Sequence, residues 1–303
     1  MIDKIKQSQF LIGVSLALLA ALGISFKAIF VKLAYAQDPT IDAITVLTIR
    51  MLFAVPFFAF VALQSTNSLS SKLQGHDYLA VMSLGLLGYY LSAALDFSGL
   101  VYVSAGLERL IIYLYPIFVV ILIAIVRRRM MNRGELIAAL VCYIGISFAF
   151  FAEAKTNTPD FYFGATLVLL ASISYSIYLV GSAKYISRLG ANRYTSYSML
   201  VSSVAIIIHY LIVNEVDLTH YDTAIYLYCF LIAIVSTVLP TFFMAHSIKY
   251  IGSSKMAIVS AIGPALTIIM ADRILAEPVS MTQFIGMGFI VAGIFMVGTK
   301  KSS

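Results

Sequence analysis

The sequence predicts an all-α membrane protein with ten transmembrane helices, arranged as two inverted five-helix repeats. Three observations predict this fold class: the composition, the number of apolar runs and a weak internal repeat. Of the 303 residues, 61% are hydrophobic and 11% are charged, whereas soluble domains average roughly 45–50% and about 25%. The mean hydropathy is +0.97. This composition excludes a soluble enzyme and indicates a chain that lies in a bilayer.

Ten apolar runs approach or exceed the length of about 20 residues that one helical crossing needs. Both halves of the chain, residues 1–152 and 153–303, contain five runs, and we expect each half to form one domain. The runs of the first half cover residues 10–31, 44–63, 78–97, 105–126 and 136–152. Those of the second half cover residues 162–181, 194–213, 223–245, 256–271 and 281–297.

The basic residues predict the orientation of the chain. The formal net charge is +6, which in a soluble chain would suggest nucleic acid as a partner. In a membrane protein, Lys and Arg collect in cytoplasmic loops instead. With both termini in the cytoplasm, the cytoplasmic segments hold 14 of the 20 Lys and Arg residues and the outer segments hold two. We therefore expect a multi-pass protein of a bacterial inner (plasma) membrane, with cytoplasmic termini and no nucleic-acid partner.

The chain also repeats itself weakly. At an offset of 148 positions Pro116 aligns with Pro264, and at an offset of 151 Gly13 aligns with Gly164. Because five helices are an odd number, the second copy must enter the membrane from the opposite side. Inverted repeats are the architecture of secondary transporters, in which the two halves surround a site at the midplane. The matched prolines should kink the fourth and ninth helices around that site.

Several short segments carry a family resemblance. They are YVSAGL at 102–107 before LYP at 114–116, YIGSS at 250–254 before GPA at 263–265, and LAEP at 275–278. Together they resemble the EamA type of the drug/metabolite transporter superfamily, over nearly the whole chain. The resemblance implies two EamA-like five-helix units and transport of small metabolites, often export of amino acids or related compounds.

The chain departs from that family in two ways. The first half replaces the usual Gly-Glu ending with Arg127-Arg128-Arg129-Met130, and the chain has no Trp. A substrate cage built on indole rings is therefore excluded.

No catalytic signature is present. The chain lacks His-Glu-x-x-His, a Walker loop and a Gly-x-Ser-x-Gly elbow, so we expect neither an enzyme nor a catalytic residue, metal or cofactor. Two other functions stay open as alternatives. One is a membrane-embedded enzyme that acts on phosphorylated lipid, and the other is a passive channel.

Five ionisable residues lie inside the first four predicted helices at similar depth. A charge in hydrocarbon costs about 2.5–3.5 kcal/mol and usually faces a cavity or a partner. In one interpretation Arg50, Asp96, Glu108 and Arg109 pair with one another to hold helices together, and Lys27 is the unbalanced cation. In the other, Lys27 or Arg109 binds a substrate carboxylate, while Asp96 or Glu108 binds an amine or carries a coupling proton.

Hydroxyl groups at helical spacing extend this predicted site. Tyr89 and Ser92 share a helix face with Asp96, and Tyr178 aligns with Lys27 in the repeat. Packing is the ordinary explanation of any one tyrosine, but their common location favours a binding site. The predicted substrate-binding residues are Lys27, Tyr89, Ser92, Asp96, Glu108, Arg109, Tyr113, Tyr175 and Tyr178.

The sequence thus predicts a secondary transporter that works by alternating access. We expect it to export small zwitterionic or weakly anionic metabolites of the amino-acid type. The expected partners are this small-molecule substrate and membrane lipid, with a homodimer as a further option.

Overall fold

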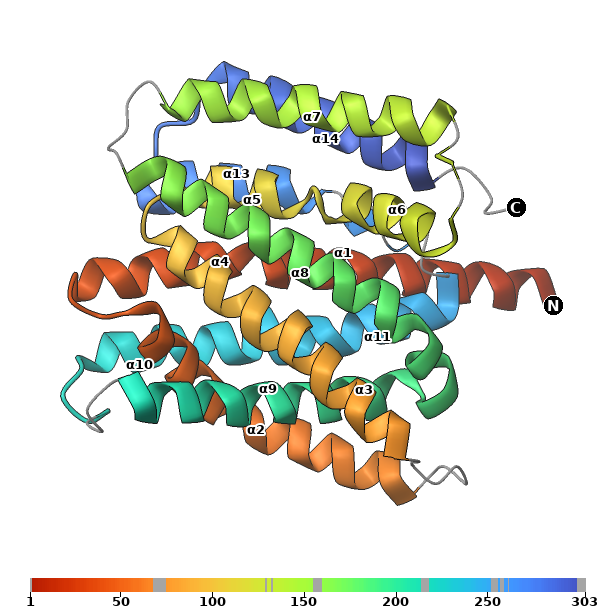
Figure 1. The fold of residues 1–303 in the computed structure, drawn as a ribbon, viewed down its shortest axis with the longest axis horizontal. Coiled ribbons are helices and arrows are strands. Elements are labelled where there is room, and N and C mark those ends of the chain that lie inside the picture. Colours follow the sequence, from red (N-terminus) through yellow and green to blue (C-terminus); the bar gives the residue numbers. More distant parts are fainter. Residues whose placement is uncertain are drawn as a thin grey trace.

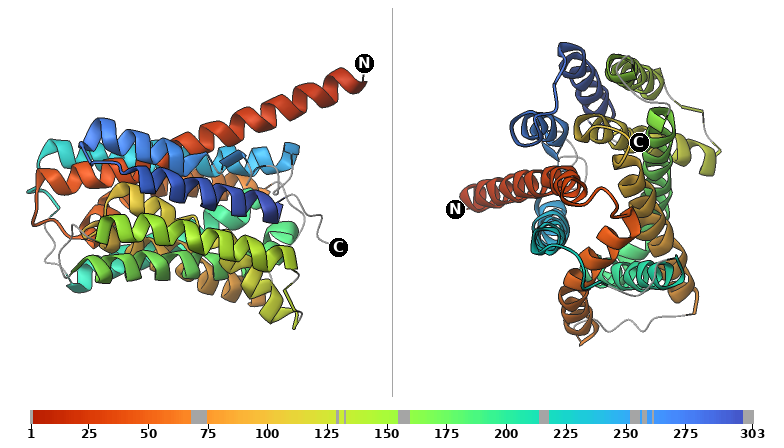
Figure 2. Two further views of the ribbon diagram at one scale, coloured as in Figure 1. Left: turned by 90° about the horizontal axis from the view of Figure 1, so that it is seen from above. Right: turned by 90° about the vertical axis from the view of Figure 1, so that its left-hand side faces the viewer.

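The computed structural model describes residues 2–67, 75–128, 130–131, 133–154, 160–213, 218–251, 256, 259–260 and 262–298. Every regular element within these residues is helical. The long helices lie side by side and form one bundle (Figure 1). Helix α1 extends beyond the others at its N-terminal end (Figure 2). The all-α fold class predicted from the sequence is confirmed.

The helices of the first half follow the predicted runs. The third run is one continuous helix that contains a π-helical turn, η1, and the fourth is divided into α5 and α6. The elements are α1 (Ile2–Gln37), α2 (Ala43–Asn67), α3 (Gly75–Gly85), η1 (Leu86–Leu91), α4 (Ser92–Leu100), α5 (Ala105–Ile112), α6 (Tyr115–Val126) and α7 (Arg133–Ala154).

The helices of the second half have the same order. The eighth run again contains a π-helical turn, η2, and parts of the ninth run lie outside the described residues. The elements are α8 (Asp160–Leu189), α9 (Ala191–Val213), α10 (Thr223–Ala233), η2 (Ile234–Val238), α11 (Leu239–Ile251), α13 (Gly263–Leu275) and α14 (Met281–Gly298).

The two prolines interrupt helices as predicted. Pro116 lies in the first turn of α6 and Pro264 in the first turn of α13. At these positions a residue without an N–H group is tolerated, because the first turn of a helix has unpaired N–H groups in any case. The predicted kink in the fourth run is therefore a break, and Tyr113 and Leu114 form a turn between two short helices.

The helices of the two halves pack in an exchanged pattern. Helix α1 packs along α11, and its counterpart α8 packs along α4. Three further contacts join counterparts directly: α2 with α9, α5 with α13, and α7 with α14. The pair of α7 and α14 lies at one edge of the bundle (Figure 1). The first residues of the two π-helical turns, Leu86 and Ile234, are 148 positions apart, which is the offset of the repeat.

Close contact between α7 and α14 depends on glycine. A Cβ atom on Gly145 would lie 2.6 Å from the carbonyl oxygen of Gly286, so a larger residue would force the helices apart. Small residues are a common device for close helix packing in membranes. The largest cluster of buried apolar side chains lies elsewhere, where α1, α2, α4, α9 and α10 meet.

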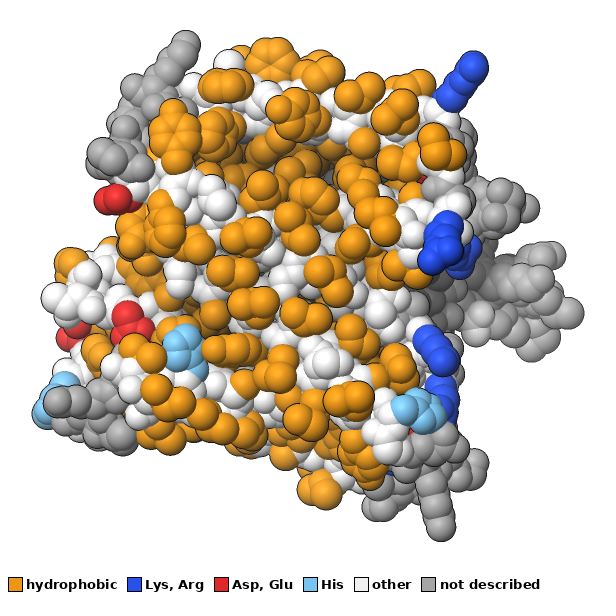
Figure 3. Space-filling model, viewed as in Figure 1, with side chains coloured by type: hydrophobic (Ala, Val, Ile, Leu, Met, Phe, Trp, Pro, Cys, Tyr) orange, Lys and Arg blue, Asp and Glu red, His pale blue; other side chains and the backbone are white. Residues whose placement is uncertain are grey.

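Seven helices within the described residues are long and apolar enough to cross a membrane. Apolar side chains cover the middle of the bundle in Figure 3. Lys and Arg side chains gather at the end where α1 begins, and Asp and Glu side chains at the opposite end (Figure 3). The chain is therefore an integral multi-pass membrane protein. The seven spans are Gln9–Gln37, Ala43–Ser65, Gly75–Leu100, Ala105–Val126, Asp160–Ser182, Ala191–Val213 and Thr223–Met244.

Candidate functional site

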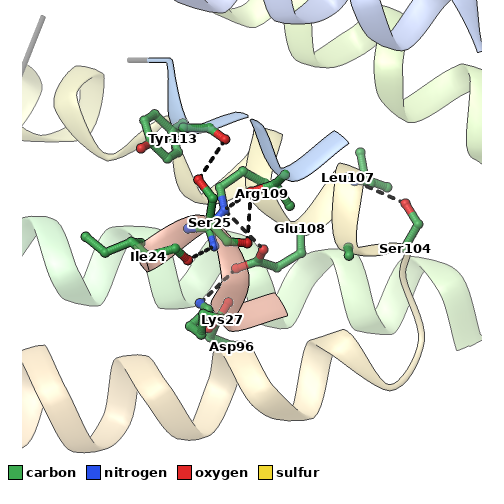
Figure 4. Close-up of polar contacts among 12 residues, drawn as sticks. Ile24, Ser25, Lys27, Asp96, Ser104, Leu107, Glu108, Arg109 and Tyr113 are labelled. Carbon is green, nitrogen blue, oxygen red and sulfur yellow. Dashed lines mark hydrogen bonds and ion pairs between the residues drawn. The ribbon is translucent and has the colours of Figure 1, made fainter. Parts of the chain in front are cut away.

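Four charged residues from three helices meet inside the bundle, and we call them the ion cluster: Lys27 of α1, Asp96 of α4, and Glu108 and Arg109 of α5. The Lys27 Nζ atom donates hydrogen bonds to Asp96 Oδ2 and, at 3.0 Å, to Glu108 Oε1 (Figure 4). The side chains of Lys27, Asp96 and Glu108 are 16%, 5% and 0% exposed. Because these charges are almost removed from solvent, each depends on its partner for compensation.

Arg109 ties the cluster to the second half of the chain. Its Nη2 atom donates to the carbonyl oxygen of Ile24 at 2.6 Å, and its Nε atom donates to Thr267 Oγ1 at 3.2 Å. The Nε atom also lies 3.8 Å from Glu108 Oε2. Thr267 in turn donates its hydroxyl to the carbonyl oxygen of Ser25. The guanidinium thus joins α1, α5 and α13 at one point.

The start of α5 fixes the position of the cluster along the bundle. The Ser104 hydroxyl accepts a hydrogen bond from the Leu107 N–H group and so forms an N-cap. The carboxylate of Glu277, in the segment after α13, accepts from the Ala105 N–H group at 3.0 Å. A negative group is favourable at this end of a helix. Glu277 therefore attaches the segment after α13 to the start of α5.

The turn between α5 and α6 contacts the matching break in the second half. The Tyr113 hydroxyl donates to the carbonyl oxygen of Ser260 at 3.0 Å. The same hydroxyl fills the space that a Cβ atom on Gly263 would need. The two interrupted helices thus meet directly, beside the ion cluster.

Seven tyrosines continue from this turn through the bundle, and we call them the tyrosine row. Successive rings lie with their centroids 4.8–6.4 Å apart. The hydroxyl oxygens of Tyr89 and Tyr178 are 2.9 Å apart. Aromatic pairs at these distances attract each other beyond the effect of burial alone. The tyrosine row consists, in order, of Tyr113, Tyr115, Tyr175, Tyr178, Tyr194 and Tyr185, with Tyr89 beside Tyr178.

The structure brings most of the predicted site residues together. Lys27, Asp96, Glu108 and Arg109 form the ion cluster, and the four predicted tyrosines all belong to the tyrosine row. Ser92 differs from them, because its hydroxyl donates to the carbonyl oxygen of Ala171 at 3.0 Å and so contributes to packing of α4 on α8. We expect Ser92 to contribute less to any ligand contact than the other eight.

One part of the predicted pairing scheme is wrong. Lys27 is not the unbalanced cation, since it binds both carboxylates. Arg50 takes no part in an ion pair within the described part of the chain, and its guanidinium lies 5.3 Å from the centre of the Phe97 ring. The cation without a carboxylate partner is therefore Arg50.

Sequence reasoning missed several polar contacts of the site. Thr267 is a lone hydroxyl in an apolar run, a weak signal that could have been used. The Ile24 carbonyl that Arg109 contacts leaves no trace in the sequence, because every residue has one. Glu277 was noted only as part of a motif, without a structural role.

A second ionic contact lies at the end of the bundle where α1 begins. The fully buried Asp77 carboxylate at the start of α3 lies 3.1 Å from Arg188 Nη2 near the end of α8, and 3.2 Å from His76 Nε2. Arg188 Nη1 and His76 Nε2 are 2.7 Å apart. This contact joins the two halves at the end opposite to the one that Glu277 joins.

The fold and these contacts define an integral membrane protein with charged residues inside its helical bundle. The EamA-like transporter family matches residues 11–151 and again residues 162–299, and the chain belongs to this family. The predicted resemblance is confirmed.

Individual relatives agree with this assignment. The chain is 32% identical over 294 residues to the uncharacterized transporter YcbK of Bacillus subtilis, covering 95% of this chain and 91% of YcbK. It is 21% identical over 281 residues to an uncharacterized transporter of Archaeoglobus fulgidus, covering 92% of this chain and 95% of that one. A solved crystal structure matches with a TM-score of 0.63 and 16% identity, over 96% of each chain. At that identity the match shows the fold alone.

Proposed function

We propose that the protein is a secondary transporter that exports small zwitterionic or weakly anionic metabolites of the amino-acid type by alternating access. The observation that carries this proposal is the ion cluster, where Lys27 binds two buried carboxylates beside the interrupted helices. Charges are costly in a membrane and usually serve a pathway or a ligand. Carboxylates can receive the amine of a zwitterion, and the adjoining tyrosine hydroxyls can both donate and accept hydrogen bonds.

We further propose ten crossings in two inverted units, residues 1–152 and 153–303. Two features support this arrangement: the same order of elements in both halves, and the exchanged packing of α1 on α11 and α8 on α4. Such an exchange is expected when a two-fold axis relates the halves. The basic residues at the end where α1 begins support cytoplasmic termini in a bacterial inner membrane (Figure 3).

Alternating access requires contacts at both ends that open in turn. The Asp77–Arg188 ion pair lies at the proposed cytoplasmic end, and the Glu277 contact with the Ala105 N–H group lies at the proposed outer end. Each joins one half of the chain to the other. In this mechanism the cytoplasmic contact opens to admit substrate, and the outer contact opens to release it.

Transport by the purified protein in proteoliposomes tests the proposal. Each of the twenty labelled amino acids is supplied on one side, with a labelled lipophilic cation as the comparison substrate and protein-free liposomes as the blank. We expect saturable movement of at least one zwitterion. Movement of the lipophilic cation with no zwitterion transported would overturn the substrate class. Movement that does not saturate would favour a channel.

A further inference from the structure

Arg50 is a buried cation that forms no ion pair in the described part of the chain. It lies in α2 and is only 6% exposed. Its Nε atom is buried without a hydrogen-bond partner. Its guanidinium carbon lies 5.3 Å from the centre of the Phe97 ring, and the Asp96 carboxyl is near enough to attract its charge without forming an ion pair.

This environment compensates the charge of Arg50 only in part. A guanidinium stays protonated in proteins, so Arg50 cannot avoid the cost of burial by losing a proton, as a lysine can. An aromatic ring attracts a cation, but more weakly than a carboxylate does at the same depth. A buried polar group without a partner needs an explanation, and a ligand that brings a negative charge is one.

Arg50 lies next to the ion cluster rather than at a separate place. Lys27 approaches the same Phe97 ring, with its Nζ atom 6.0 Å from the ring centre. Asp96 precedes Phe97 in the chain, and its Oδ1 atom is buried and has no hydrogen-bond partner within the described residues. An unused donor and an unused acceptor, both buried, therefore occur near one aromatic ring.

A zwitterion has the complementary pair of charges. Its carboxylate matches the planar guanidinium, which can bind both oxygens at once. Its ammonium group matches the free oxygen of Asp96. Lys27 and Arg109 are less suited to the carboxylate, because both already donate to protein oxygens.

We propose that Arg50 binds the carboxylate of the transported molecule, with the free Asp96 oxygen receiving its amine. The identity of this molecule as an amino-acid-like zwitterion rests on the proposed function. The carboxylate site itself does not rest on the proposed function, because it follows from a buried guanidinium that forms no ion pair within the described residues.

Carboxylate binding can be measured without knowing the substrate. The melting temperature of the purified full-length protein is recorded in detergent with propionate or benzoate, and with the neutral amides propionamide and benzamide. We expect the carboxylates to raise the melting temperature and the amides to leave it unchanged. Arg50→Gln should weaken the carboxylate affinity roughly tenfold or more, while Arg50→Lys keeps part of it.

The matched control is Arg273→Gln, which removes an arginine whose side chain is 82% exposed. This variant should respond to propionate as the wild type does. Equal carboxylate responses of the wild type and Arg50→Gln, or no response of the wild type, would overturn the proposal. An equal response to chloride would overturn its carboxylate part.

A second measurement separates ligand binding from a structural role. Arg50→Met removes a buried charge that forms no ion pair in the described part of the chain, so the ligand-free variant should melt at a higher temperature than the wild type. A lower melting temperature would mean that Arg50 stabilises the empty protein, which contradicts the proposal. If the protein binds carboxylates but transports no amino acid, Arg50 is still a carboxylate-binding residue. In that case only the proposed function, export of amino-acid-like molecules, is overturned.

Discussion

The two halves of the chain have the same order of helices but very different residues at matched positions. Lys27 corresponds to Tyr178 at an offset of 151, and Asp96 corresponds to Met244 at an offset of 148. The second half therefore forms the same elements with neutral side chains where the first half has charges. The fold does not require ions at these positions, which favours a functional reason for them.

Two other charged residues of the first half also correspond to neutral residues in the second half. At an offset of 148, Arg50 corresponds to Ser198 and Glu108 to Met256. If an axis in the membrane plane relates the halves, these positions lie on opposite sides of the midplane. The proposed path then has tyrosines toward the cytoplasm and ions toward the outside. An exported zwitterion would meet aromatic hydroxyls first and the ion cluster second.

The largest expected effect comes from making the first half as neutral as the second. The triple variant Lys27→Met, Asp96→Asn, Glu108→Gln should lose transport by roughly 100-fold or more, because several charged contacts disappear together. Its melting temperature should lie closer to that of the wild type than the melting temperature of Lys27→Met does, since three charges of the ion cluster are removed together and only Arg109 loses its carboxylate neighbour. The melting temperature is measured on the purified protein, and transport is measured in proteoliposomes.

The single variant Lys27→Met is the matched comparison. It leaves the buried Asp96 carboxylate without its ion-pair partner and Glu108 with Arg109 alone, so it should lose transport and also about 3–5 kcal/mol of stability. Lys27→Arg keeps the charge and serves as the conservative control. A triple variant that fails to fold would mean that the ion cluster is structural, and the contrast between the halves would lose its functional meaning.

A smaller effect is expected in the tyrosine row. Tyr178→Phe keeps the ring stacking but removes the hydroxyl that lies 2.9 Å from the Tyr89 hydroxyl. One neutral hydrogen bond contributes about 0.5–1.5 kcal/mol, so the transport KM should rise about 2- to 10-fold. Tyr143→Phe is the control, because Tyr143 is 70% exposed on α7. Unchanged kinetics for Tyr178→Phe would remove its hydroxyl from the proposed path.

Much of the fold could be predicted because membrane helices leave a strong compositional signal. Each predicted run contains helical residues in the described part of the chain, although the ninth run is described only in part, and Pro116 marked the break before α6. The π-helical turns η1 and η2 could not be predicted. One extra residue per turn changes the backbone hydrogen bonds without any change in residue type.

The sequence predicted which charged residues lie together in the site, but not which of them form ion pairs. Counting 1.5 Å per residue gives the depth of a side chain along its helix, and on that basis the five charges fall together. Depth does not tell how far each helix is rotated about its axis. The sequence therefore could not show that Lys27, rather than Arg50, faces the two carboxylates.

The most direct test is an experimental structure of the protein with a transported amino acid bound. We expect the amino acid between the ion cluster and the tyrosine row, with its carboxylate on Arg50 and its amine on Asp96. An amino acid bound away from Arg50, with the contacts of Lys27 to Asp96 and Glu108 unchanged, would contradict the proposed role of the charged first half.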